Sequence, residues 1–217
     1  MCAAAWIRRL ALGLAICLLA AVLAGEALAA GWGNNDQNTW DAEDMERVRK
    51  RRQERLRQQV ETYKDALKVV QKEESQVGTA LKQGEAKANA GSDPVQKSRT
   101  LRLARHKAIA GLKQVDFKYG RLYVAVEKLG AERDIPSEAK SGAAILLTQV
   151  RDGARTNRER MADLYEQVDE PVKALKLLES VYKGIPDTGR ASAGTLKQRI
   201  KALKQQLGIR DPSDGGM

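Results

Sequence analysis

The chain contains few of the residues that build thick globular cores or reactive sites. Of its 217 residues only 4% are aromatic, and it has five prolines, two cysteines and one histidine. Alanine, leucine, lysine, arginine, glutamate and glutamine are abundant instead, and these residues enter a helix at little cost in free energy. The composition therefore predicts a thin, elongated, all-α protein of one or two small domains.

The first residues have the features of a secretion signal. Arg8 and Arg9 precede an apolar run over residues 10–25, and Ala27 and Ala29 provide small residues at the two positions that a signal peptidase recognises. The run is shorter than the roughly 20 residues of a membrane-spanning helix. We therefore expect a signal peptide over residues 1–29 that is cleaved after about Ala29, and an exported mature chain that is periplasmic or secreted. An uncleaved membrane anchor is the alternative.

Cleavage would remove both cysteines, Cys2 and Cys17. The mature chain would then form no disulfide and would offer no thiolate to a metal, a haem or a substrate. The single histidine, His106, lies between Arg105 and Lys107 with no nucleophile or second ligand near it in the sequence. The sequence also lacks a Gly-rich phosphate loop and a Gly-x-Ser-x-Gly elbow. We therefore expect no enzyme activity, no cofactor and no metal.

A Gly- and Asn-rich tether at residues 30–40 is followed by two segments with a heptad repeat. Within residues 41–131, apolar residues recur at alternating steps of four and three, which is the pattern of a coiled-coil seam. The first seam skips one position, at Glu74. Between the segments, Asp93 and Pro94 provide a capping carboxylate and a proline suited to a first helical turn. The pattern predicts a long antiparallel helical hairpin. The seam of its first helix comprises Leu56, Val60, Tyr63, Leu67, Val70, Val77 and Leu81.

The beginning of this hairpin is strongly basic. Seven of the eleven residues from 47 to 57 are cations, namely Arg47, Arg49, Lys50, Arg51, Arg52, Arg55 and Arg57. Each cation near an anionic surface contributes about 1 kcal/mol of attraction, so the run is a candidate site for an anionic membrane surface or envelope polymer. A solvated helix face is the competing interpretation. No aromatic residues alternate with the cations, and we do not expect nucleic acid binding.

Small, aromatic and turn residues follow a recognisable order in residues 155–186. The residues that carry it are Met161-Ala162, Tyr165, Ala174, Leu178 and the final Pro186. The pattern resembles one tetratricopeptide repeat (TPR), although Arg158 stands where this family usually has tryptophan and Val181 where it has a small residue. A single repeat cannot bury its own apolar face. We therefore expect neighbouring helices to cover it, with residues 137–157 on one side.

The resemblance implies a small TPR-like helical array over residues 137–208, closed by a terminal capping helix and followed by a frayed tail at 209–217. Tetratricopeptide repeats present a concave face to peptides or partner proteins. The resemblance therefore implies a partner-binding face that includes Asn157, Arg158, Met161 and Tyr165.

These features favour an exported, non-catalytic protein–protein interaction module, a TPR-like scaffold or adaptor of the bacterial cell envelope. A periplasmic holdase-type chaperone is one alternative. A binder of anionic envelope polymer or membrane surface, acting through residues 47–57, is another. The expected partners are other envelope proteins, and formation of a homo-oligomer through the hairpin is left open.

Overall fold

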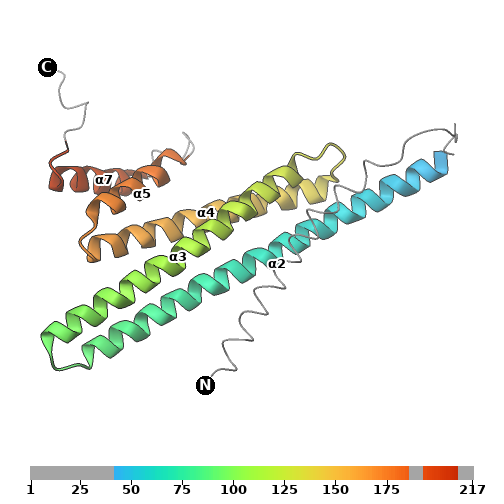
Figure 1. Cartoon of the computed structure of the whole chain (residues 1–217). Coiled ribbons are helices and arrows are strands. Elements are labelled where there is room, and N and C mark those ends of the chain that lie inside the picture. Colours follow the sequence, from blue (N-terminus) through green and yellow to red (C-terminus); the bar gives the residue numbers. More distant parts are fainter. Residues whose placement is uncertain (1–41, 186–192, 210–217) are drawn as a thin grey trace, which may run out of the picture. The chain divides into compact units, whose positions relative to one another are not determined.

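The computed structural model describes residues 42–185 and 193–209, where every regular element is a helix. The prediction of an all-α fold is confirmed. The helices are α2 (Ala42–Asn89), α3 (Pro94–Gly130), α4 (Ser137–Gln167), α5 (Pro171–Lys183) and α7 (Gly194–Gln206) (Figure 1). The predicted signal peptide, the tether, Pro186 and all of the predicted tail except Ile209 lie outside the described residues. The chain divides between Met45 and Glu46, and the packing set out below lies in the unit that begins at Glu46.

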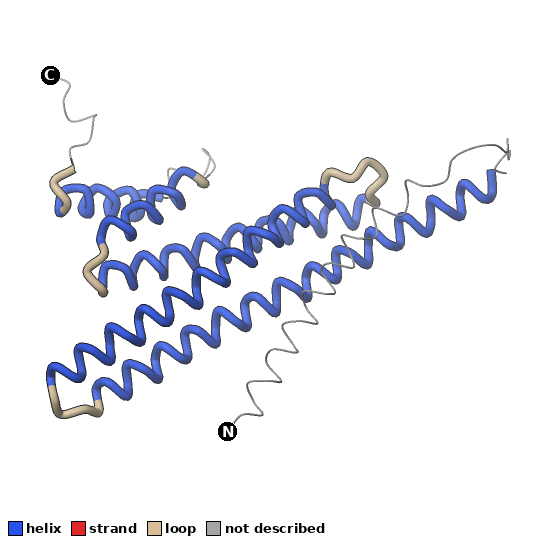
Figure 2. Tube along the Cα trace, viewed as in Figure 1, coloured by secondary structure: helices blue, strands red, loops and turns tan. Residues whose placement is uncertain are grey.

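The turn between α2 and α3 is short because its last residue starts the next helix. Oδ1 of Asp93 accepts a hydrogen bond from the backbone N–H of Val95 at 2.9 Å, and Pro94 occupies the first helical turn. The carboxylate satisfies an N–H that has no partner inside the helix, and proline has no N–H to satisfy. The two helices therefore run antiparallel on either side of residues 90–93 (Figure 2).

Glycines let α2 and α3 approach closely near this turn. A Cβ atom at Gly84 would lie 2.6 Å from the Cβ of Ala104, and a Cβ at Gly111 would lie 2.8 Å from a methyl carbon of Val77. Favourable carbon–carbon contacts have lengths of about 3.5–4.0 Å, so a larger residue at either position would push the helices apart.

Helix α4 is one continuous element of 31 residues that packs along α3 (Figure 1). The residue pattern predicted a packing helix at residues 137–157 that is separate from the first helix of a repeat. That division was wrong. The junction contains no proline, and its lone Gly153 is tolerated inside a helix whose apolar face is buried throughout.

Helices α5 and α7 complete the C-terminal part of the structure. The chain leaves α4 through Asp169, which has a positive φ of 62°, a conformation that aspartate tolerates better than most residues. Ala162, Ala174 and Leu178 are fully buried in the apolar cluster shared by α4 and α5. Helix α7 occupies the segment for which a capping helix was expected, and it adds Leu196, Ile200 and Leu203 to this cluster.

Three apolar clusters follow one another along the bundle. The first joins α2, α3 and α4 around Leu129, beside the loop that connects α3 to α4. The second joins the same three helices around Leu146. The third joins α3, α4, α5 and α7, and it includes Val77 and Leu81 of α2 only as partly buried neighbours. Helix α2 is therefore fully part of the shared core over only part of its length.

Candidate functional site in the groove between α2 and α4

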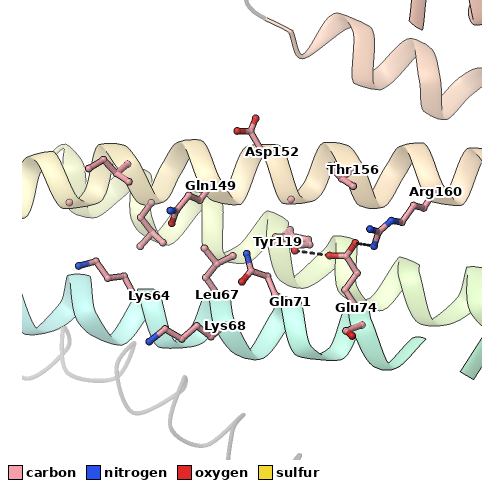
Figure 3. Close-up of a pocket in the computed structure, with 15 residues that line it drawn as sticks. Lys64, Leu67, Lys68, Gln71, Glu74, Tyr119, Gln149, Asp152, Thr156 and Arg160 are labelled. Carbon is pink, nitrogen blue, oxygen red and sulfur yellow. Dashed lines mark hydrogen bonds and ion pairs between the residues drawn. The ribbon is translucent and has the colours of Figure 1, made fainter. Parts of the chain in front are cut away.

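A groove of about 930 Å³ runs between α2 and α4, and α3 contributes one residue, Tyr119, to its lining (Figure 3). The polar side chains along its two walls include Lys64, Lys68, Gln71, Gln149, Asp152 and Thr156. Amides, a hydroxyl and charges of both signs therefore face the same space. The groove can offer hydrogen bonds and ion pairs to a bound segment along both walls.

A cluster of three polar side chains lies at one end of this groove. Glu74, which occupies the skipped seam position, is only 8% exposed. Its Oε2 atom accepts a hydrogen bond from the hydroxyl of Tyr119 at 2.9 Å, and its Oε1 atom accepts one from Nη1 of Arg160 at 2.5 Å (Figure 3). A buried carboxylate is tolerated only when it is paired in this way. Glu74, Tyr119 and Arg160, which we call the Glu74 cluster, join α2, α3 and α4.

The environment of Tyr119 keeps its hydroxyl protonated. Burial, and then the hydrogen bond to the Glu74 carboxylate, raise the pKa of Tyr119 well above its ordinary value. The phenolate would lose its hydration and would lie beside another negative charge. Tyr119 therefore acts at neutral pH as a fixed hydrogen-bond donor to Glu74, and it is poorly suited to act as a general base.

Two glycines of α4 bring its backbone close to the other helices at this groove. A Cβ atom at Gly153 would lie 2.7 Å from the ring of Tyr119, and a Cβ at Gly142 would lie 3.1 Å from a methyl carbon of Val60. Both glycines also line the groove. The backbone of α4, rather than side chains, therefore borders the groove at these two places.

A smaller hollow of about 280 Å³ lies beyond the ion pair, and Glu74 and Arg160 border both spaces. Apolar residues that line it include Val77, Leu81 and Leu164. The first two belong to the predicted seam of α2, yet they are only partly buried. The Glu74 cluster therefore stands between a larger section lined by both polar and apolar residues and a smaller, more apolar section of the same interface.

The residues predicted to form a partner-binding face are mostly buried. Asn157 has no exposed surface, and its Nδ2 donates a hydrogen bond to the backbone carbonyl of Leu112 in α3 at 3.0 Å. Met161 and Tyr165 lie in the apolar cluster shared with α3, α5 and α7. Arg158 is partly buried and donates to an α3 carboxylate. The prediction of an accessible face at Asn157, Met161 and Tyr165 was wrong, because neighbouring helices cover that side of α4.

The seven basic residues at the start of α2 fall into two groups. Lys50, Arg52 and Arg57 form ion pairs with carboxylates of α2, of the loop between α3 and α4, and of α4 itself. Arg47 also has an interaction. Within the described residues no ion pair involves the remaining three, which are all exposed. They are Arg49, Arg51 and Arg55.

The described residues contain no group of three or more histidine, cysteine, aspartate or glutamate side chains that could hold a metal ion. None of the helices in this part of the chain has the length and apolar character needed to cross a membrane. The chain matches no family model, no curated protein and no solved structure. The resemblance to a tetratricopeptide repeat therefore stays a prediction from the residues quoted for it.

Proposed function

We propose that this protein is an exported, non-catalytic protein–protein interaction module of the bacterial cell envelope. It would act as a scaffold or adaptor that binds a helix of another envelope protein in the groove between α2 and α4. The observation that carries the proposal is the incomplete interface between these helices, which combines a groove of about 930 Å³, lined by polar and apolar residues, with partly exposed seam residues.

A helix with one apolar face suits this surface better than an extended peptide. The groove lies between two long helices, which is where an additional helix packs in a bundle. Val77 and Leu81 are spaced by four residues and so lie on one face of α2, ready to contact apolar residues at the same spacing. Lys64, Gln71 and Gln149 would meet the polar flank of the incoming helix.

Site-specific photocrosslinking in intact cells tests this proposal. A benzophenone amino acid would replace Gln149 or Thr156, which line the groove, and Lys176, which is exposed on α5, would serve as the control position. We expect one defined envelope protein to be captured from both groove positions and not from the control position. Capture of many unfolded proteins would instead support a holdase. Capture of no protein from the groove would overturn the proposal.

Paired substitutions sharpen the same experiment. Val77→Asp with Leu81→Asp places charge on the apolar section and should abolish capture from the groove. The matched control is Val172→Asp, at an exposed apolar residue of α5. Circular dichroism would establish that both variants keep the parental helix content. Unchanged capture by the double variant would contradict docking at the apolar section.

A second candidate function is favoured by the three exposed arginines that form no ion pair with any described residue. Arg49, Arg51 and Arg55 are available to an anionic envelope polymer, and the chain as a whole carries a net charge of +10. Their attraction to such a polymer should weaken steeply as ionic strength rises, because the Debye length is only about 10 Å at 0.1 M salt.

Charge-neutralising variants test this second function. Replacing Arg49, Arg51 and Arg55 with glutamine should weaken salt-sensitive binding to a polyanion such as heparin, measured by the salt concentration needed for elution. The matched control replaces Lys50, Arg52 and Arg57, whose charges are already paired. Equal losses in the two triple variants would show that net charge alone drives binding.

A further inference from the structure

The outward side of α3 carries a second heptad repeat that is separate from the seam. Its members are Leu103, Ala110, Phe117 and Val124, at steps of seven residues. The last three each precede, by two positions, a buried residue on the core face of α3, namely Leu112, Tyr119 and Val126. Two helical positions correspond to a rotation of about 200°, so these residues lie on the side of α3 opposite its core face.

The large apolar members of this repeat are well exposed. The exposed fractions are 55% for Leu103, 65% for Phe117 and 49% for Val124. Four residues after each repeat member comes a polar residue, and three of these four are cations. They are Lys107, Gln114, Arg121 and Lys128. The guanidinium of Arg121 lies 5.9 Å from the ring centre of Phe117. We call these eight residues the α3 stripe.

The charges of α3 restrict what can cover this stripe. Glu127 is the one exposed acidic residue of α3, so the outward face is predominantly positive. Two copies of the stripe packed together would bring like charges into contact, which disfavours a dimer through this face. Each heptad also contributes only one apolar residue, whereas a seam that packs against a partner helix has two. An anionic surface would attract the positive charges of this face. A surface that does not interdigitate with the helix would also need only one apolar residue per heptad.

We propose that the α3 stripe docks α3 lengthwise on an anionic lipid bilayer. Leu103, Phe117 and Val124 enter the boundary between head groups and acyl chains, and Lys107, Arg121 and Lys128 reach the lipid phosphates. The repeat spans about 32 Å from Leu103 to Val124 at 1.5 Å per residue. This docking leaves the groove between α2 and α4 available, and it does not depend on the function proposed for that groove.

A fluorescent reporter on the stripe tests the docking directly. The full chain with Cys2→Ser, Cys17→Ser and Ala110→Cys would carry an environment-sensitive dye at residue 110, which is exposed. With vesicles of phosphatidylglycerol and phosphatidylcholine we expect a shift of the emission to shorter wavelength and quenching by nitroxide-labelled lipid. Pure phosphatidylcholine vesicles should give neither change. A dye at Lys176→Cys reports whether the signal is specific to α3, because the apolar run at residues 10–25 could itself bind vesicles.

Two sets of substitutions separate the apolar and the electrostatic parts. The first set replaces the apolar residues with serine (Leu103→Ser, Phe117→Ser and Val124→Ser). In a lipid titration followed by the dye at residue 110, this triple variant should need at least tenfold more lipid to reach half of the parental emission shift. The second set replaces the cations with glutamate (Lys107→Glu, Arg121→Glu and Lys128→Glu), and this triple variant should also need at least tenfold more lipid. The matched apolar control combines Val48→Ser, Val69→Ser and Val172→Ser, and the matched charge control combines Lys87→Glu, Lys176→Glu and Lys201→Glu. All six positions are exposed and lie outside α3. Both controls should retain the parental shift.

Three outcomes would overturn the proposal. A dye at residue 110 that stays in water while the protein is on anionic vesicles would show that another part of the chain binds. If the glutamate variant lost the emission shift and the serine variant kept it, the apolar residues would not insert and the attraction would be purely electrostatic. Absence of any lipid signal, with crosslinking of a benzophenone at Gln114 to one acidic helical protein, would show that the stripe is a protein interface.

Discussion

On one side of Glu74 the interface between α2 and α4 has a shared buried core, which we call its closed end, and on the other side, its open end, α2 is only partly buried. Near the loop between α3 and α4, a Cβ atom at Gly142 of α4 would lie 3.1 Å from a methyl carbon of Val60 of α2, and three helices share a buried apolar cluster. Towards the turn between α2 and α3, Val77 and Leu81 remain partly exposed beside a hollow. Glu74 lies between these two parts of the interface. The same apolar spacing along α2 therefore has two different structural outcomes.

The difference shows what one charged residue does to a seam. A paired carboxylate inside a core contributes little net stability, because the loss of hydration offsets most of the attraction. It can instead fix the register of the helices, because the carboxylate must meet both Tyr119 and Arg160. Because the cluster holds α2 and α4 together at Glu74, the two helices can lie further apart between Glu74 and the turn that follows α2. The smaller hollow beside Val77 and Leu81 is thus a consequence of where the Glu74 cluster stands, whereas the larger groove lies on the other side of Glu74, above the shared apolar core.

The largest effect is expected from shortening an apolar side chain at the closed end. Leu146→Ala should reduce the free energy of unfolding by about 2–5 kcal/mol, because Leu146 is almost completely buried and its loss leaves a cavity. Leu81→Ala at the open end should cost less than half as much, because Leu81 is only partly buried. Urea unfolding of both variants measures the difference. Equal losses would show that the open end is as tightly packed as the closed end.

The next effect concerns the contact between α4 and Tyr119. Gly153→Ala should destabilise the fold by about 1–3 kcal/mol, because the new methyl group would lie 2.7 Å from a rigid, buried ring. Gly120→Ala is the matched control. No atom lies within 4 Å of a Cβ at Gly120, so this change should stabilise the helix by about 0.5–1 kcal/mol. Thermal unfolding followed by circular dichroism measures both, and destabilisation by both would contradict the specific contact.

A double-mutant cycle tests whether the Glu74 cluster acts as a unit. Glu74→Ala should cost about 1–3 kcal/mol, because the buried hydroxyl of Tyr119 loses its acceptor. Tyr119→Phe alone leaves the carboxylate paired with Arg160 and should cost about 1 kcal/mol. The double variant should lose less than the sum of the two, because the second change removes the unsatisfied group. Additive losses in urea unfolding would contradict the coupling.

The sequence contains enough information to predict the helices but only part of their packing. The heptad spacing predicts the seam of α2, and Asp93 with Pro94 predicts the start of α3, because both signals act through neighbouring residues. The burial of Met161 was missed because the repeat frame was imposed on residues 155–186. The buried residues Leu146, Val150, Asn157 and Met161 follow helical spacing across the supposed boundary, and this signal of one continuous helix was available.

The candidate site could not be predicted in the same way. Glu74 is recognisable as a gap in the seam, but its partners lie 45 and 86 residues away in the chain. Nothing local in the sequence pairs Glu74 with Tyr119 or Arg160. The need for glycine at position 153 is equally non-local, because the ring that excludes a side chain there belongs to α3. Interactions between distant segments are set by packing, which the local pattern of a single sequence does not specify.

The smallest expected effect is a dependence of stability on alkaline pH that arises from Tyr119. Its pKa is raised in the folded protein, so above about pH 10 the unfolded chain loses this proton while the folded chain retains it. The contribution of Tyr119 to stability is therefore complete below about pH 10 and is lost as the pH rises through the folded-state pKa. One proton corresponds to a slope of at most about 1.4 kcal/mol per pH unit. Urea unfolding between about pH 9 and pH 11 should show a steeper decline for the parent chain than for Tyr119→Phe, and parallel declines would show that folding does not raise the pKa of this hydroxyl through burial and the bond to Glu74.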